Sequence, residues 1–190
     1  GYFSGGGGAD VPTGVNWGDY IIWDDSTNQW IIRSDKVNIG MNAGKVNQST
    51  DAISIGSNAG YSGQKSNAIS IGLNSGNENQ SSDAISIGNN AGKKNQGANS
   101  IAIGISAGIS GQSNNCIAIG QNCGKNQGLN SISIGNNAGE QSQSSNSVCI
   151  GSSSGNKSQG SSCVAIGSDS GKENQSSLNA ALAARGLPSE

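Results

Sequence analysis

The stretch AISIGSNAG, residues 52–60, decides the fold, because variants of it recur along most of the chain. Its two isoleucines, Ile53 and Ile55, stand two residues apart, which is the period of a β-strand. Their side chains therefore lie on one side of the strand, and those of Ala52 and Ser54 lie on the other. Glycines at the end of the strand and four residues later indicate turns that need a positive φ or a close backbone approach. The unit is predicted to be a strand, a corner and a return.

An Ile-Gly step marks each copy of this unit, and it occurs nine times in the chain. The spacing is sixteen residues, except for fifteen between Gly120 and Gly135, where the polar run that follows the corner is one residue short. We therefore expect that run to be a loop, since loops tolerate deletions. A helix is a poor alternative, because glycine costs roughly 1 kcal/mol against alanine in a helix interior and each unit carries at least two glycines. The repeat predicts an all-β parallel β-solenoid of nine coils over residues 36–175.

Within this solenoid we expect the large apolar residues to stack as an inward core ladder. The ladder consists of Ile53, Ile55, Ile69, Ile71, Ile85, Ile87, Ile101, Ile103, Ile117, Ile119, Ile132, Ile134, Val148, Ile150, Val164 and Ile166. The turn glycines of the first coils are Gly40, Gly44, Gly56, Gly60, Gly72, Gly76, Gly88 and Gly92.

Two inward isoleucines per coil stabilise it by about 1.5–3 kcal/mol each, while each ordered residue costs ~1 kcal/mol or more of conformational entropy. A single chain therefore buries too little apolar surface. We expect the other strand face to pack against another chain. This outward small face consists of Ala52, Ala68 and Ala84 with Ser54, Ser70 and Ser86.

The composition indicates neither an enzyme nor a cofactor protein. The chain has no histidine, the commonest acid-base residue, and its carboxylates are scattered. Its four cysteines form no C-x-x-C pair, so we expect no metal, and unpaired thiols favour assembly in a reducing compartment. The stretch GQNCGK, residues 120–125, resembles a phosphate-binding loop, but its spacing is one residue short and no Ser or Thr follows the lysine. We expect no nucleic acid partner.

The two ends of the chain differ from the repeats. Residues 1–14 form a Gly-rich arm that carries Tyr2 and Phe3, and residues 15–35 predict a β-hairpin that carries Trp17, Trp23 and Trp30. We expect the hairpin to cover the open edge of the first coil, and these five aromatic residues are candidates for contact with a partner. Residues 176–190, SSLNAALAARGLPSE, predict a short helix that caps the last coil. No signal peptide or membrane-spanning run is visible.

The repeats resemble the head repeats of trimeric autotransporter adhesins, the YadA-like head. The resemblance is carried by SIAIGISAG (100–108), CIAIGQNCG (116–124) and CVAIGSDSG (163–171), and it extends over residues 36–175. It implies a left-handed parallel β-roll that assembles as a homotrimer and binds host surfaces. The segment GDYIIWDDSTNQWIIRSDKVNIG (18–40) is similar to segments that precede such repeats in fibre proteins of large DNA viruses and phages. The chain departs from the adhesins in having four cysteines and neither a coiled-coil stalk nor an anchor barrel.

We therefore expect a non-enzymatic, adhesin-like fibre head on a virion, phage or cell surface, without membrane insertion. Its partners would be further copies of itself and a host surface glycan or protein. The alternative is a filament subunit that polymerises head to tail through the solenoid ends or the N-terminal arm. Hexapeptide-repeat acyltransferases usually rely on a histidine, and ice-binding solenoids need regular threonine arrays, so both fit this sequence less well.

Overall fold

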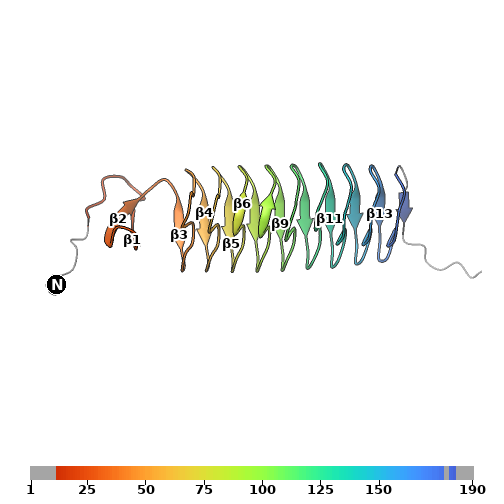
Figure 1. The fold of residues 1–190 in the computed structure, drawn as a ribbon, viewed down its shortest axis with the longest axis horizontal. Coiled ribbons are helices and arrows are strands. Elements are labelled where there is room, and N and C mark those ends of the chain that lie inside the picture. Colours follow the sequence, from red (N-terminus) through yellow and green to blue (C-terminus); the bar gives the residue numbers. More distant parts are fainter. Residues whose placement is uncertain (1–11, 178–179, 183–190) are drawn as a thin grey trace, which may run out of the picture.

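The computed structural model describes residues 12–177 and 180–182, and in it the chain forms a parallel β-solenoid. The coils stack along one axis, and a β-hairpin lies at the N-terminal end (Figure 1). One strand from each coil joins a ten-stranded sheet in the order of the chain. Its strands are β3 (Val37–Ile39), β4 (Ile53–Ile55), β5 (Ile69–Ile71), β7 (Ile85–Ile87), β9 (Ile101–Ile103), β10 (Ile117–Ile119), β11 (Ile132–Ile134), β12 (Val148–Ile150), β13 (Val164–Ile166) and β14 (Ala180–Leu182).

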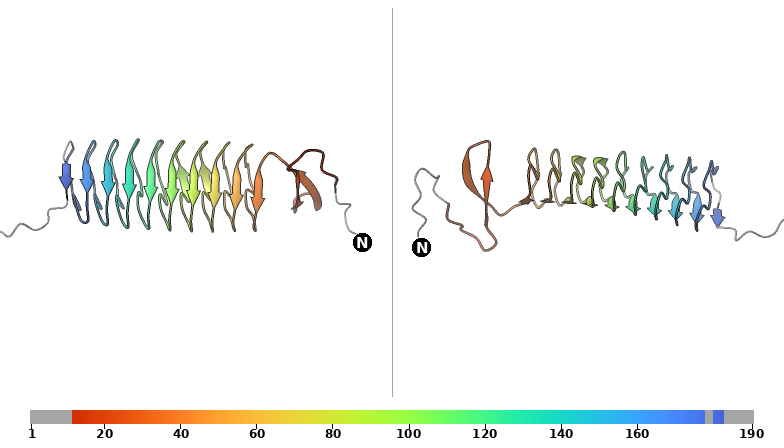
Figure 2. Two further views of the ribbon diagram at one scale, coloured as in Figure 1. Left: turned by 180° about the vertical axis from the view of Figure 1, so that it is seen from behind. Right: turned by 90° about the horizontal axis from the view of Figure 1, so that it is seen from below.

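The register of this sheet follows the sequence repeat. Each strand pairs with the equivalent residues of the next coil, so Ile53 lies beside Ile69 and Ile55 beside Ile71. The fifteen-residue coil keeps the same pairing, with Ile117 beside Ile132. Its shortened run, Lys125 to Gln127, lies outside any strand, as predicted. In two other coils the same run forms short parallel strands, β6 (Glu78–Gln80) and β8 (Lys94–Gln96), which lie across the coil from the large sheet (Figure 2).

The alternation within each strand is as predicted, but the predicted direction is wrong. Ser54 is fully buried and its hydroxyl donates to Oε1 of Gln64 inside the coil (2.6 Å), so Ile53 and Ile55 point outward. None of the sixteen residues of the predicted core ladder is buried. The small face, predicted to point outward, is instead the interior, and Ala52, Ala68, Ala84, Ser54, Ser70 and Ser86 are all 0% exposed.

The reason is that the interior of a coil is too narrow for isoleucine. A Cβ atom placed on Gly60 would lie 2.3 Å from the hydroxyl oxygen of Ser54 and 2.5 Å from Oε1 of Gln64. Small residues and one glutamine from each coil therefore fill the space, and protein interiors have few voids. The buried glutamines are Gln48, Gln64, Gln80, Gln96, Gln112, Gln127, Gln143 and Gln159.

Most of these glutamines bond to the glutamine of the next coil, and together they form a ladder along the axis. The Nε2 group of Gln64 donates to Oε1 of Gln80 (3.1 Å) and to the carbonyl oxygens of Ile53 (2.9 Å) and Ala68 (3.0 Å). Buried amides need such partners, since an unpaired buried polar group costs about 1–3 kcal/mol. The core of this solenoid is thus polar and hydrogen-bonded rather than apolar.

The hairpin consists of β1 (Tyr20–Asp24) and β2 (Gln29–Arg33), which pair antiparallel. The Tyr20 hydroxyl donates to the carbonyl oxygen of Lys36 (2.6 Å) and accepts from the N–H of Asn38 (3.0 Å). Lys36 precedes β3 as Ala52 precedes β4. The carbonyl oxygen of Ala52 accepts a hydrogen bond from the N–H of Val37 in the preceding coil, whereas that of Lys36 accepts from Tyr20. Among the described residues β3 pairs only with β4, so Tyr20 occupies backbone groups on the open edge of the first coil.

The C-terminal helix predicted for residues 176–190 is wrong where the structure describes that segment. Ala180–Leu182 is a strand that pairs with Val164, Ala165 and Ile166. The sixteen-residue register, which links Ile166 to Leu182, overrides the helix propensity of the alanines. The rest of the predicted helix, residues 178–179 and 183–190, lies outside the described residues.

Candidate functional site

The outward side chains of the large sheet form a continuous apolar surface, which we call the isoleucine face. It consists of the sixteen residues of the ladder given above, two from each of the eight strands of the large sheet that run from β4 to β13, without β6 and β8. In-register pairing sets each side chain beside its equivalent in the next coil, so the surface is two parallel rows along the stacked strands. Contact along a row shields each side chain only in part. Ile87, Ile150 and Ile166 remain 36%, 37% and 40% exposed.

An exposed face of this kind is uncommon on a protein that remains a monomer, because contiguous apolar patches usually mark interaction sites. The isoleucine face carries no charged residue, and it extends over eight successive coils. Its chemistry is limited to burying apolar surface. It is therefore a candidate interface with another protein surface.

The cysteines lie inside the solenoid and are not reactive groups. Cys116, Cys123, Cys149 and Cys163 are buried and free. Burial raises the pKa of the Cys123 and Cys149 thiols to about 12, so both are protonated near neutral pH. The thiol of Cys149 stands where other coils have serine and donates to Oε1 of Gln159 (2.5 Å). These cysteines serve as small interior residues.

No group of three or more metal-ligating side chains gathers among the residues that the structure describes. No helix in that part of the chain is long and apolar enough to cross a membrane.

The structure brings together two of the five aromatic residues predicted to contact a partner. Trp23 and Trp30 face each other across the hairpin, with ring centroids 5.3 Å apart and planes at 74°. Both side chains are 42% exposed. Trp17, which precedes the first strand of the hairpin, is fully exposed. Tyr2 and Phe3 lie outside the described residues.

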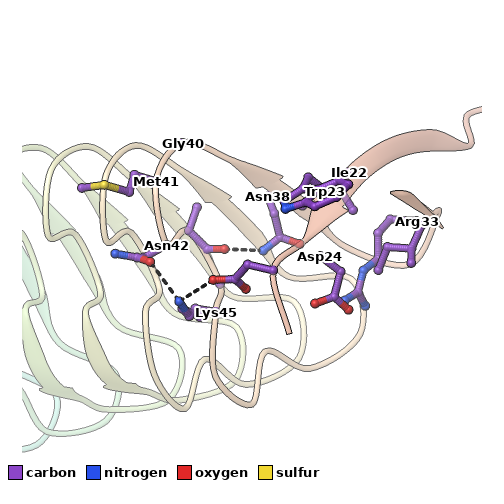
Figure 3. A pocket seen from close by; sticks show the side chains of 13 residues that line it. Ile22, Trp23, Asp24, Arg33, Asn38, Gly40, Met41, Asn42 and Lys45 are labelled. Carbon is purple, nitrogen blue, oxygen red and sulfur yellow. Dashed lines mark hydrogen bonds and ion pairs between the residues drawn. The ribbon is translucent and has the colours of Figure 1, made fainter. Parts of the chain in front are cut away.

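A second candidate site is a space of about 390 Å³ between the hairpin and the first coil, which we call the hairpin hollow. Ile22, Trp23, Asp24, Asp25, Ile31 and Arg33 line it from the hairpin, and residues 38 and 40–45 line it from the coil (Figure 3). The ammonium group of Lys45 binds the carboxylate of Asp25 (2.9 Å) and bridges the two walls. The sequence analysis did not predict this hollow, because it depends on how the hairpin sits against the coil.

Comparisons of the chain with protein-family models, with curated proteins and with solved structures found no match.

Proposed function

We propose that the protein is a non-enzymatic structural protein whose chains associate side by side through the isoleucine face. In this assembly three chains form the head of a fibre on a virion, phage or cell surface, and the head mediates attachment. The observation that supports the proposal is the position of the ladder: the largest apolar side chains of the repeat lie outside the coil. The number three follows from the resemblance to YadA-like head repeats.

The association explains how so polar a chain becomes stable. The interior holds glutamine, serine, alanine and cysteine, so a coil buries little apolar surface by itself. Covering an isoleucine contributes roughly 25 cal/mol for each Å² removed from water. Each coil adds two such residues to the interface, and the stabilisation grows with the number of coils.

The N-terminal hairpin, in this proposal, caps the first coil. Tyr20 occupies the edge groups of β3 that a further coil would need. An occupied edge disfavours the alternative function, a filament that grows by stacking the N-terminal coil on another molecule. Lateral association leaves that cap in place.

The experiment that tests the proposal is multi-angle light scattering of the purified chain over a concentration series, with negative-stain imaging. A discrete trimer whose mass does not grow with concentration is expected. A monomer at every concentration would contradict the proposal, and long filaments would favour the alternative.

A further inference from the structure

Most polar side chains that line the hairpin hollow already form hydrogen bonds within the protein. Lys45 binds Asp25 (2.9 Å) and the Oδ1 atom of Asn42 (3.3 Å), as the dashed lines of Figure 3 show. The Nδ2 group of Asn38 donates to the carbonyl oxygen of Ala43 (2.8 Å) and to Oε1 of Gln48 (2.7 Å). These groups shape the hollow but have little left to offer a ligand.

Two polar groups of the hollow are not used in this way. The Nε atom of Arg33 is buried and has no acceptor among the described residues. Asp24 accepts two bonds from Ser26 at Oδ1, and Thr27 lies near the same carboxylate, whose partners are thus all neutral donors of the hairpin turn. No ion pair joins either residue to another in the described part of the chain. The guanidinium of Arg33 lines the hollow and has no hydrogen-bond acceptor among the described residues, so its terminal amino groups can donate to a ligand there.

The remaining lining is apolar, and the charges of the hollow balance. Ile22 and Ile31 come from the hairpin, and Met41, 69% exposed, stands on the coil side. Two cations, Arg33 and Lys45, match two carboxylates, Asp24 and Asp25. A volume of about 390 Å³ is within the range of about 300–1,000 Å³ typical of small-molecule sites. The matching ligand is therefore small and uncharged, with hydroxyl groups on one side and C–H groups on the other.

We propose that the hairpin hollow binds one uncharged pyranose unit of a surface glycan. A sugar hydroxyl accepts from Arg33, another donates to Asp24, and the C–H face of the ring lies against the apolar lining. The inference rests on the attachment function proposed above and names the class of target. A sugar acid is disfavoured, because its carboxylate would give the balanced hollow a net negative charge.

The test is saturation-transfer NMR of the full chain with methyl glycosides of glucose, galactose, mannose and N-acetylglucosamine, at up to about ten times a millimolar Kd. At least one neutral glycoside is expected to bind, and the methyl glucuronide, which differs from the glucoside only in its carboxylate, is expected to bind more weakly. No binding by any neutral glycoside, or tighter binding of the glucuronide, would overturn the proposal.

Two variants and a control locate the site. Arg33→Met and Asp24→Asn, which keeps the oxygen that Ser26 bonds, are each expected to weaken binding at least about tenfold, the loss for one hydrogen bond to a charged group. Trp17→Ala, outside the hollow, is expected to leave binding unchanged. Equal binding by all three variants would overturn the site. Light scattering on the same samples separates this outcome from failure of the fibre function, because a trimer without sugar binding contradicts only the hollow.

Discussion

At the residue scale, the composition of the chain follows from the backbone of a coil. In one coil, positive φ occurs at Gly56, Asn58, Gly60, Gly63 and Asn67. Glycine adopts such angles without a Cβ clash, and asparagine tolerates the left-handed region better than other residues. The abundance of Gly and Asn is thus a requirement of tight coiling and not a sign of disorder.

The glycine at the end of each strand has a second requirement, which predicts a large effect of Gly72→Ala. A Cβ at residue 72 would lie 2.7 Å from the carbonyl oxygen of Gly88 in the next coil. The clash with backbone adds to the cost of positive φ, about 1–3 kcal/mol. We expect a loss of more than about 3 kcal/mol in unfolding free energy, measured by urea denaturation. Gly18→Ala is the control, because it shares a positive φ but meets no atom within 4 Å; an equal loss there would contradict the packing argument.

A single missing hydroxyl predicts a stabilising substitution in the core. Ser54 and Ser133 donate to the glutamine oxygens of their coils, but Ala102 stands at that position beside Gln112. The Oε1 atom of Gln112 is buried and has no hydrogen-bond partner in the described chain. Ala102→Ser is therefore expected to raise the unfolding free energy by about 1 kcal/mol in thermal or urea denaturation.

The matched control for this substitution is Ala118→Ser. Oε1 of Gln127 already accepts a bond from Gln112 (3.0 Å), so a hydroxyl at residue 118 has less to satisfy. We expect a smaller gain there. If both substitutions changed stability equally, the unpaired oxygen would not be the cause.

At the element scale, the sequence was sufficient to predict where the strands lie but not which of their faces points into the coil. The two-residue period of Ile53 and Ile55, and the sixteen-residue spacing, correctly placed strands and registers. The direction was wrong because large apolar residues are usually buried, whereas the width of a coil depends on its turns. A signal was present, since glutamine recurs once per coil and is kept even within the fifteen-residue coil, at Gln127. A polar residue kept at a fixed position by every coil is better explained by burial than by a loop.

The sites were less predictable than the strands. The hairpin was recognisable from YIIW and WIIR, but Tyr20 was not singled out, because its role depends on a contact with the backbone of β3. Arg33 could not be predicted either, since only the three-dimensional structure shows whether a cation has a partner. The helix predicted at the C-terminus followed local propensity, which the ladder overrides at Ala180–Leu182.

The contact between Tyr20 and β3 predicts a pH-dependent edge. Burial raises the pKa of the Tyr20 hydroxyl above its usual value of 10.0. Because the folded state favours the protonated form, the stabilisation is complete below pH 10 and is lost as the pH rises through the raised value. We expect an ultraviolet absorbance titration of a variant with Tyr2 and Tyr61 changed to Phe to show a pKa above 10. The hydrogen bond from the N–H of Asn38 lowers the pKa, so a value at or below 10 would contradict the burial of the hydroxyl.

The same contact predicts local opening in Tyr20→Phe. The variant keeps the ring but loses both hydrogen bonds to the edge of β3, at about 1 kcal/mol each. We expect faster hydrogen exchange at Asn38 than in the wild type. The amide of Ile69, which bonds Ala84 far from the hairpin, is expected to exchange at an unchanged rate and is the internal control.

At the scale of the whole molecule, the two faces of each strand differ in chemistry. The inward face is small and polar enough to close a narrow coil around hydrogen-bonded glutamines, and the outward face holds the large apolar side chains. A coil therefore specifies its own shape from within and, in the proposed assembly, its association from outside. Repetition multiplies both, because every added coil extends the glutamine ladder and the isoleucine face together.

This division predicts that a charge on the isoleucine face separates the chains without unfolding them. Ile87→Asp places a carboxylate at a 36% exposed position in the middle of the rod. In a monomer the charge remains in water and costs little, but in a trimer it would be buried in an apolar interface without a partner. Light scattering is expected to show monomers, and circular dichroism an unchanged β spectrum. Ile105→Asp, 55% exposed and outside the strands, is the control and should remain trimeric. Dissociation of both variants, or of neither, would place the interface elsewhere on the rod.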